Sequence, residues 1–484
     1  MGRAAFFVLL VLFVPLSLLL WCFYSTMLPS PSDLLPGEGS SHTKQLRPSA
    51  SSKCEGRWIY VYNLSESFNH AILERCRDIR RGQDLCPYME NSGMGREVNY
   101  GIDSEESGSL GILKKDNPWF NTWQFSLEIY FHERLKKHPC TTSVEADANA
   151  FYVPYYAGMD LVYRISHHLP REALSHGLLQ WLKGRPSWRR KGGRDHFITL
   201  GRIARDFRMP RGSSWGSQML LHPEWRSMVK LTLERDGTKQ DATDKEIGIP
   251  YPTFFHPVLA TQVQALAVWL LQSKQRVSMA SMAGRNRNKT AVFRQRLFDR
   301  CEQDQRCSLI VCVPDTESQS PYLALPLNYI SGQTVNATCS LPSLLSFFHR
   351  SEFCLQPAGD SPSRRSYFDA MLAGCIPVIF DRNSAWTQYT SHLPVDGSSY
   401  SIYIPQSALR RQSIFDILHS VPKWKIKLMR EKIAELLPRI LYTHTSVQQL
   451  YPNAVAKTPI EDYMANKDSF ERAIDAVLMK MRKL

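Results

Sequence analysis

The amino-acid sequence predicts an α/β fold built on two parallel sheets, and three observations carry this prediction. Short apolar runs alternate with amphipathic helical stretches, which is typical of βαβ units. Residues 353–380 read as a strand, a polar turn, a helix and a strand with almost no polar side chain. The chain has 484 residues, 43% of them apolar, so it can form two domains with separate cores. We therefore expect two Rossmann-like domains, at 54–270 and 271–484, that face each other across a cleft.

The predicted elements form two series along the chain. In the first series, strands are expected at 58–62, 150–156 and 196–200, and helices at 125–137 and 171–183. The second series begins near Arg276, with strands expected at 308–313, 353–355, 376–380 and 401–404. The last two helices, at 422–442 and 467–483, are expected to close the second domain, and one of them could cross back to the first.

The N-terminal part of the chain predicts a membrane anchor followed by a stem. Residues 4–24 carry no charged side chain and, at roughly 20 residues, are long enough to cross a bilayer as a helix. Arg3 lies before this stretch and the next Lys or Arg is Lys44, so the tail of residues 1–3 is expected in the cytosol. A cleaved signal peptide is the alternative, although its apolar core would be shorter. Residues 25–53, rich in Pro, Ser and Gly, are expected to form a flexible lumenal stem.

Cysteine usage agrees with an oxidising, lumenal compartment. Once Cys22 is assigned to the anchor, an even set of cysteines remains, and some of them are expected to pair. Cys301 and Cys307 flank a polar loop and are candidates for a local bridge, whereas Cys354 and Cys375 lie in apolar strands and are expected to be buried free thiols. A zinc site would need closely spaced ligand pairs, which are missing. The remaining lumenal cysteines are Cys54, Cys76, Cys86, Cys140, Cys312 and Cys339.

Three sequons would be accessible to N-glycosylation in the same compartment. They begin at Asn63, Asn288 and Asn336. Asn63 directly follows a predicted core strand, so it is the weakest candidate of the three.

The chain is basic, with a formal net charge of +14. The densest basic run is Arg185–His196, where Trp188 lies among the arginines, a combination also found in nucleic-acid-binding proteins. A membrane-anchored lumenal head would not meet nucleic acid, so we discount that class. Arg189, Arg190 and Lys191 are expected to form a solvated basic loop. Positive potential would also favour a nucleotide-sugar dianion and an anionic membrane.

Residues 353–380 are predicted to bind a phosphorylated ligand. The polar turn 356–362 contains Gly359, which can adopt backbone angles closed to other residues. Ser361 or Ser363 could cap a helix that runs from about residue 364 to residue 373, and Gly374 is expected to end that helix.

A helix start of this kind offers unpaired backbone N–H groups and the positive end of the helix dipole to a pyrophosphate. Arg364 and Arg365 would add charge-assisted donors, and Asp369 could accept hydrogen bonds from ribose hydroxyls. The alternative is an ordinary capped helix whose arginines are solvated.

The segment GDSPSRRSYFDAMLAGCIPV, at Gly359–Val378, resembles the signature of the exostosin-like glycosyltransferases, in particular the plant branch that includes the xyloglucan galactosyltransferases. The paired arginines favour this branch. Two departures leave fine substrate identity open: Ala204 stands where the family often has Trp, and SHLP at 391–394 replaces a Trp-His-Leu-Pro run. Six further motifs resemble the family in the same order: RWIYVYNL (57–64), WFNTWQFSLEIYFHERL (119–135), DANAFYVPYYAGMDL (147–161), GRDHFITLGRIARDFR (193–208), IPYPTFFHP (249–257) and SMAGRNR (281–287).

The resemblance implies an inverting Golgi transferase with a GT-B type fold and a type II membrane anchor. It implies UDP-galactose as donor and a xylosyl side chain of xyloglucan as acceptor, joined in β linkage during hemicellulose synthesis in the cell wall. The resemblance also extends to transferases that use UDP-galacturonic acid, UDP-arabinofuranose or a mannan acceptor, and these alternatives stay open. The expected partners are the UDP-sugar, the polysaccharide and the Golgi membrane, without nucleic acid; complexes with other glycosyltransferases are a further possibility.

The transfer needs groups that stabilise the departing pyrophosphate and a base for the acceptor hydroxyl. Asp160 and His196 are the candidates for the base, although Asp160 could instead cap a helix and His196 could be a core histidine. His256 is a weaker candidate. No metal is expected, because the chain has no Asp-x-Asp pair of the kind that chelates a diphosphate through a cation. The predicted donor-binding residues are Arg202, Arg285, Gly359, Asp360, Ser361, Arg364, Arg365 and Asp369.

Two rival classes fit the sequence less well. A glycoside hydrolase would need a pair of carboxylates flanking the bond, and no spacing in the chain singles out such a pair. A non-catalytic assembly subunit would keep the fold and lose the donor site, but Arg364, Arg365 and Asp369 are all present. The sequence therefore favours a transferase.

Overall fold

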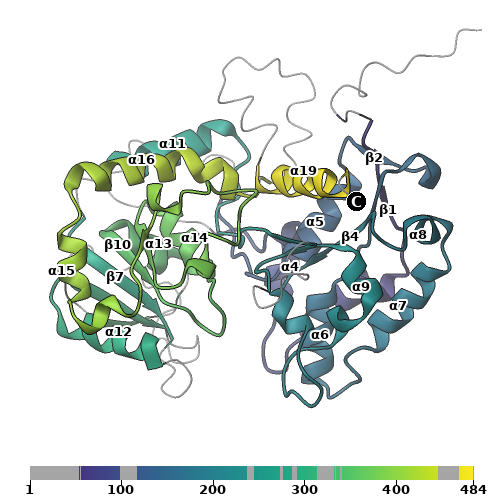
Figure 1. Cartoon of the computed structure of the whole chain (residues 1–484), viewed down its shortest axis with the longest axis horizontal. Helices are drawn as coiled ribbons and strands as arrows, with labels where there is room; N and C mark the ends of the chain where they lie inside the picture. The colour runs from purple at the N-terminus through teal and green to yellow at the C-terminus, as the bar shows by residue number, and fades with distance from the viewer. Residues whose placement is uncertain are drawn as a thin grey trace, which may run out of the picture. The chain divides into compact units, whose positions relative to one another are not determined.

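Two parallel sheets of six strands each organise the part of the chain that the structure describes (Figure 1). The computed structural model describes residues 54, 56–98, 117–236, 245–272, 276–285, 292–312, 332, 334–337, 339, 341–444 and 468–482. Among these residues, no helix is both long enough and apolar enough to cross a bilayer. The predicted tail, anchor and stem, at 1–3, 4–24 and 25–53, lie outside the described residues.

The first sheet has the strand order β2-β1-β3-β4-β5-β6, and all its pairings are parallel. This is a flavodoxin-type order extended by one strand. The strands predicted at 58–62, 150–156 and 196–200 are confirmed as β1, β3 and β4, while the other three were missed. The bounds are β1 (Ile59–Val61), β2 (Thr141–Thr142), β3 (Ala150–Tyr152), β4 (His196–Leu200), β5 (Val229–Thr232) and β6 (Glu246–Gly248).

The second sheet has the order β12-β11-β10-β7-β8-β9, again with every pairing parallel. Read from β9, the chain order is 3-2-1-4-5-6, which is the Rossmann order, and its switch point lies between β7 and β10. The predicted second series is confirmed as β8, β10, β11 and β12. The bounds are β7 (Ser278–Gly284), β8 (Cys307–Cys312), β9 (Thr334–Ala337), β10 (Ser351–Gln356), β11 (Ile376–Ile379) and β12 (Ile402–Tyr403).

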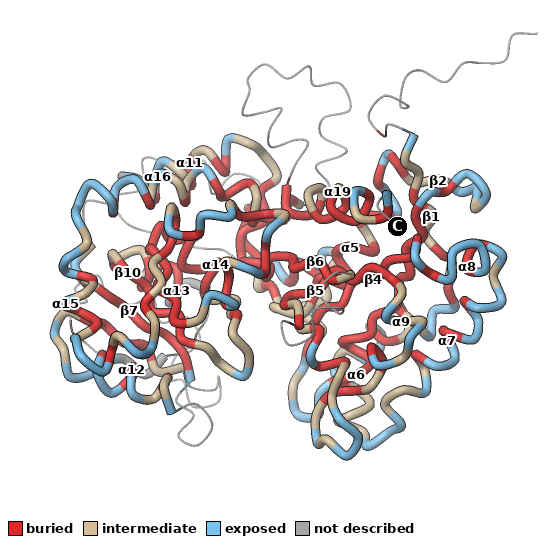
Figure 2. The backbone as a smooth tube through the Cα atoms, viewed as in Figure 1, coloured by how far each residue is buried: buried red, intermediate tan, exposed pale blue. Residues whose placement is uncertain are grey.

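Helices cover both sheets, so the strands are mostly buried while exposed residues gather on the outer sides of helices (Figure 2). The α-helices are α3 (His70–Leu73), α4 (Cys86–Gly93), α5 (Leu127–Lys136), α6 (Ala157–Ser166), α7 (Ala173–Lys183), α8 (Pro186–Lys191), α9 (Pro223–Ser227), α11 (Ala260–Gln272), α12 (Val292–Gln303), α13 (Leu341–His349), α14 (Arg365–Leu372), α15 (Ile414–His419), α16 (Lys423–Ile440) and α19 (Ser469–Arg482). Short 3-10 helices are η1 (Glu66–Phe68), η3 (Glu145–Asp147), η4 (Ala204–Phe207), η5 (Met219–Leu221), η7 (Arg382–Ser384), η8 (Gly397–Ser399) and η9 (Ala408–Arg410).

The C-terminal helix α19 packs against α5 beside the first sheet, which confirms the predicted crossing (Figure 1). Phe131 of α5 and Phe470 of α19 lie with ring centroids 5.0 Å apart. Arg134 of α5 forms a buried ion pair with Asp468, which directly precedes α19. Burial of such a pair is favourable only when both charges are well bonded, and Asp468 also accepts from the Thr443 hydroxyl at 2.7 Å.

The described residues contain five disulfides, and one prediction about them is wrong. Cys354 and Cys375 are not free thiols but are bonded to each other. Cys354 lies in β10, and Cys375 directly precedes the neighbouring strand β11. The pairing of these two strands brings the buried cysteines together. The predicted local bridge between Cys301 and Cys307 is confirmed. The other bridges are Cys54–Cys140, Cys76–Cys86 and Cys312–Cys339.

Candidate functional site

The segment that joins β10, α14 and β11 forms the strand, turn, helix and strand predicted from the sequence. The predicted cap is wrong: Arg364 is the N-cap of α14, and no side chain caps the helix. Gly359 does not adopt a positive φ. The predicted end is confirmed, because Gly374 has φ +65° and the Cys375 N–H donates to the Ala370 carbonyl at 3.0 Å.

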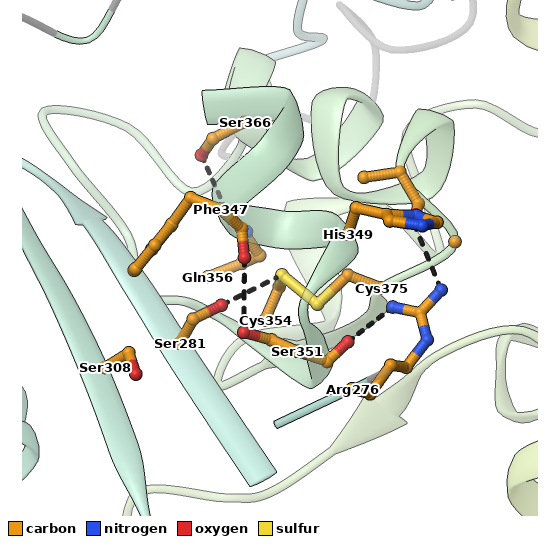
Figure 3. Close-up of a disulfide and its surroundings, with 12 residues drawn as sticks. Arg276, Ser281, Ser308, Phe347, His349, Ser351, Cys354, Gln356, Ser366 and Cys375 are labelled. Atoms are coloured by element: carbon orange, nitrogen blue, oxygen red, sulfur yellow. Dashed lines mark hydrogen bonds between the residues drawn. A yellow bond between two sulfur atoms is a disulfide. The ribbon is translucent and has the colours of Figure 1, made fainter. Parts of the chain in front are cut away.

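The disulfide between Cys354 and Cys375 closes a loop that contains the whole turn and α14 (Figure 3). Both cysteines are fully buried, and the Ser281 hydroxyl of β7 lies 3.4 Å from the Cys354 sulfur. Arg276 supports the same region by donating to the Ser351 carbonyl at 2.5 Å (Figure 3). The disulfide and the Arg276 hydrogen bond therefore stabilise the strands on either side of the turn and α14.

Two guanidinium groups meet at the carboxyl ends of β7 and β10, the switch point of the second sheet. Arg364 donates to the carbonyls of Ala283 at 3.5 Å and Pro357 at 3.3 Å. A Cβ placed on Gly284 would collide with the Arg294 guanidinium and lie 3.2 Å from Nη2 of Arg364. A Cβ on Gly359 would lie 3.9 Å from Nη1 of Arg294. This concentration of positive charge beside an uncapped helix start suits a diphosphate.

Arg294 was missed by the sequence reasoning. It lies in the first turn of α12, is buried, and its guanidinium carbon lies 5.6 Å from the ring centroid of Phe298. An arginine on an amphipathic helix usually points to solvent, so nothing in its spacing marked it. Arg285, which was predicted, directly follows β7 at the same edge of the sheet and is exposed.

Arg365 contacts different residues from Arg364: Thr122 and Phe254, which come before the second sheet in the chain. Its Nη1 donates to the Thr122 carbonyl at 2.5 Å, and its guanidinium carbon lies 3.6 Å from the ring centroid of Phe254. Its Nε lies 3.5 Å from Asp369, one helical turn along α14. Burial raises the pKa of Asp369 to about 6, against the lowering effect of Arg365.

Three buried polar atoms in this pair have no hydrogen-bond partner among the described residues, namely Nε and Nη2 of Arg365 and Oδ1 of Asp369. Buried groups of this kind usually bind water or a ligand. Asp369 therefore has an acceptor atom, Oδ1, for the predicted hydrogen bond from a ribose hydroxyl. Arg365 does not contribute to the pair formed by Arg294 and Arg364 at the switch point.

Glu234 connects the first sheet to the segment after β10. It follows β5 and is buried, and its Oε2 accepts hydrogen bonds from the Ser363 N–H, at 2.7 Å, and from the Ser363 hydroxyl. Burial raises the pKa of Glu234 above the ordinary value, while the side chains of Ser363 and Ser361 lower it. Ser361 was predicted to bind the diphosphate, whereas here it faces Glu234. Asp360, also predicted, is exposed, and its carbonyl accepts from Arg205 at 3.4 Å.

Arg202, a predicted donor-binding residue, lies two residues beyond the end of β4, and its partners were not foreseen. Its guanidinium carbon lies 4.3 Å from the ring centroid of Phe125 and 4.8 Å from that of Trp215. Its Nε donates to Asp206 at 2.7 Å. Burial raises the pKa of Tyr251, and among the charges that act on it Glu234 and Asp206 add to this shift while Arg202 opposes it.

Glu128 of α5 is a further carboxylate that the sequence did not reveal. It is fully buried and accepts from the N–H groups of Gly158, at 2.7 Å, and Gly201, at 2.9 Å. It thereby joins the start of α6 to the loop that carries Arg202. Burial raises its pKa to about 7, although these backbone N–H groups and Arg202 lower it. Gly201 is required, because a Cβ there would lie 2.6 Å from the Phe125 carbonyl oxygen, whereas a Cβ on Gly158 would lie 2.9 Å from Cγ of the Arg202 side chain.

Comparison with known proteins settles the family. The sequence model of the Exostosin GT47 domain matches residues 53–421. The chain belongs to this family. Among relatives from Arabidopsis thaliana, the probable xyloglucan galactosyltransferase GT15 is 35% identical over 461 residues, which cover 92% of this chain and 86% of that protein. Xyloglucan galactosyltransferase MUR3 is 33% identical, covering 90% of this chain and 64% of that protein.

A third Arabidopsis thaliana relative, xyloglucan-specific galacturonosyltransferase 1, is 34% identical and covers 89% of this chain and 58% of that protein. A crystal structure of Anabaena Alr3699/HepE in complex with UDP-glucose aligns with 83% of this chain and all of that chain, at 9% identity and a TM-score of 0.33, too low to support an inference. Family membership and these relatives make the chain an exostosin-type glycosyltransferase.

In this glycosyltransferase, Asp160 lies in the first turn of α6 and lines a cavity of about 210 Å³ together with Arg75 and Tyr163. Both of its carboxylate oxygens accept from Nε of Arg164, at 2.8 and 2.9 Å, and Oδ2 also accepts from the Tyr155 hydroxyl at 2.7 Å. Burial raises its pKa despite these contacts. A carboxylate committed to a cation and a phenol is a poor base, so its catalytic role stays a prediction without support from the geometry.

His196 is fully buried at the start of β4. Its Nδ1 lies 2.9 Å from Asp195 and its Nε2 lies 2.8 Å from the Tyr62 hydroxyl, so both nitrogens are used. The amino end of β4 is opposite the carboxyl end that leads to Arg202. This placement fits a core histidine, and its catalytic role likewise stays a prediction that the geometry does not support. His256 is also buried, between Thr122 and the Tyr442 carbonyl.

One cluster of the described residues could hold a metal ion: ligand atoms of His70, His132 and Glu133 lie within 4.8 Å of one another. Lys136 donates to Glu133 at 2.8 Å and places a positive charge there, which disfavours a cation. The cluster lies on α3 and α5, away from the segment after β10.

The surface predictions have mixed outcomes. Arg189, Arg190 and Lys191 are exposed, as predicted, but they form the last turn of α8 instead of a loop, and Arg190 pairs with Asp195 at 3.3 Å. Asn63 is exposed just after β1, so burial does not prevent its glycosylation. Asn288 lies outside the described residues, and so does the side chain of Asn336.

Proposed function

We propose that this glycosyltransferase moves galactose from UDP-galactose to xylosyl side chains of xyloglucan, with inversion at the anomeric carbon. Two relatives whose names include xyloglucan galactosyltransferase support the sugar and the acceptor. The observation that carries the donor part is the meeting of Arg294 and Arg364 at the switch point of the second sheet.

The two arginines would stabilise the leaving group. When C1 of the sugar separates from the β-phosphate, negative charge develops on the departing oxygen, and cations fixed at that position lower the barrier. Arg364 is held by two backbone carbonyls and Arg294 is buried against Phe298, so neither needs to be ordered at the moment of reaction. The uncapped start of α14 adds N–H donors.

We propose that the reaction needs no metal ion. Two guanidinium groups supply positive charge of the same magnitude as a divalent cation at the diphosphate. Asp369, with its unpaired oxygen, is the proposed acceptor for ribose hydroxyls. Arg202 and Arg285 lie at carboxyl ends of strands and could contact the donor from the first and second sheet respectively.

We propose a GT-B arrangement, in which the second sheet binds the donor and the carboxyl edge of the first sheet presents the acceptor. We call residues 357–375, between β10 and β11, the donor segment. The contact between Glu234 and Ser363 supports the proposed arrangement, because it joins the end of β5 to this segment. The two sheets would then place the acceptor hydroxyl on the side of C1 opposite the diphosphate, as inversion requires.

A second candidate donor is UDP-galacturonic acid, because a relative at 34% identity is named a xyloglucan-specific galacturonosyltransferase. A uronate would need a cation near C6 of the sugar. Arg202 is committed to Asp206, which favours the neutral sugar.

We also propose a type II protein of the Golgi membrane, with residues 4–24 as anchor and the described residues in the lumen. The disulfides support an oxidising compartment. Protease protection of the head in sealed microsomes would test this topology: digestion of the head from the outside would contradict it.

A panel of UDP-sugars tests the proposed function. The purified full chain is incubated with xyloglucan oligosaccharides and each UDP-sugar in the presence of EDTA, and UDP release is measured. We expect the largest acceptor-dependent release with UDP-galactose. No acceptor-dependent release with any UDP-sugar would contradict the transferase, and release only after added metal would contradict the metal-free mechanism.

A further inference from the structure

Glu234 is the acidic residue of the first sheet that directly contacts the donor segment. It lies two residues beyond the end of β5, and its carboxylate reaches both the backbone N–H and the hydroxyl of Ser363. Ser363 immediately precedes Arg364, the N-cap of α14. Glu234 therefore lies at the position where a group from the acceptor side would meet a sugar bound on the second sheet.

The partners of Glu234 distinguish it from the other buried acids. Asp206 is bonded to Arg202 and Trp215, and Asp369 is paired with Arg365. Glu128 is held by backbone N–H groups. Glu234 forms no ion pair with a described residue, and its hydrogen-bond partners are the N–H and the hydroxyl of Ser363. A carboxylate without a cationic partner keeps its basicity.

The environment of Glu234 also raises its affinity for a proton. Its side chain is only 5% exposed, and burial raises its pKa, to which the nearby Asp206 adds. Burial raises the pKa values of Tyr251 and Tyr389, and the negative charge of Glu234 adds to both shifts.

We propose that Glu234 is the general base that accepts the proton of the acceptor hydroxyl. This inference rests on the proposed function. In the step, the acceptor oxygen forms a bond to C1 of the sugar while the bond from C1 to the β-phosphate oxygen breaks. The electron pair of that bond leaves with UDP, and the hydroxyl proton moves to the Glu234 carboxylate, which later releases it to solvent. The Ser363 hydroxyl already shows how an O–H group is bound by this carboxylate.

A purely structural role is the alternative, in which Glu234 only holds the donor segment in place. The amide oxygen of glutamine can still accept from Ser363, whereas it cannot take a proton at neutral pH. Glu234→Gln therefore separates the two roles. Ser363→Ala is the complementary variant, because it removes the hydroxyl contact and leaves the carboxylate intact.

The experiment measures transfer by the full chain for wild type, Glu234→Gln, Glu234→Asp and Ser363→Ala, with UDP binding and thermal unfolding recorded for each. Glu224→Gln is the matched control, since Glu224 forms only a partly exposed ion pair with Lys183 on the outer side of the protein. We expect Glu234→Gln to lower kcat roughly 100- to 10,000-fold with UDP binding retained. Glu234→Asp should keep part of the rate, and the control should match wild type.

The pH profile gives a second readout. In wild type, kcat/KM should fall as pH drops through the pKa of the base. The residual kcat/KM of Glu234→Gln should not show this fall at low pH. A Glu234→Gln variant with normal kcat would overturn the inference. So would equal losses in Glu234→Gln and Ser363→Ala with weakened UDP binding, which would show a structural role. An inactive wild type would instead contradict the proposed function, and the inference with it.

Discussion

Arg294 lies in α12 and Arg364 is the N-cap of α14, and both direct their guanidinium groups toward Gly284 at the end of β7. Arg364 was found from the sequence and Arg294 was not. Their meeting depends on the Rossmann strand order, which places the carboxyl ends of β7 and β10 side by side.

Removal of either arginine should weaken donor binding. We expect Arg294→Ala and Arg364→Ala each to weaken UDP binding roughly 10- to 100-fold, because each loses a charge-assisted hydrogen bond to phosphate. Isothermal titration with UDP checks this. Arg296→Ala is the matched control, since Arg296 is exposed on the same helix. UDP affinity that is unchanged in both variants would place the diphosphate elsewhere.

Loss of the disulfide beneath the donor segment should destabilise the fold. We expect the double variant Cys354→Ala/Cys375→Ala to lose about 3 kcal/mol of unfolding free energy, because the bridge closes a loop with a sequence separation of 21. Removing the Cys301–Cys307 bridge, with a separation of 6, should cost less, about 2 kcal/mol. Urea denaturation of both double variants gives the comparison; equal losses would argue against loop closure as the cause.

Glu128 should make stability depend on pH. Its pKa is raised from 4.5 to about 7 in the folded chain, so the folded state binds more protons than the unfolded state between these values. The contribution of this group to stability is complete below about pH 4.5 and is lost as pH rises through 7, by up to about 3 kcal/mol. Unfolding free energies of wild type and Glu128→Gln across pH 4.5–8 measure it. A wild-type curve parallel to that of the variant would contradict the assignment.

The ion pair between Arg134 and Asp468 should anchor the C-terminal helix. Asp468→Asn leaves the buried Arg134 charge without its partner, which should cost roughly 3–5 kcal/mol. Glu435→Gln, at an exposed pair with Lys432, should change stability by less than about 1 kcal/mol. Chemical denaturation of the two variants tests the difference, and a similar small effect for both would show that packing of Phe470 alone fixes α19.

The sequence predicted the parallel sheets and the strand, turn, helix and strand of residues 353–380 well because local signals mark them. The apolar strand at 376–379 and the end of α14 at Gly374 depend on residues close in the chain. Arg294, Glu234 and Glu128 were not predicted, because their roles come from contacts made across the fold. The free-thiol prediction for Cys354 and Cys375 failed for the same reason: strand pairing, which no local pattern reveals, places them within bonding distance.

The most direct test of the account is the product formed from UDP-galactose and xyloglucan oligosaccharides by the purified full chain, analysed by mass spectrometry and NMR. The account predicts one added hexose on a xylosyl residue with a β anomeric configuration, and loss of that product when Arg364 is replaced by Ala. An α-linked product, or the same yield from Arg364→Ala, would contradict it.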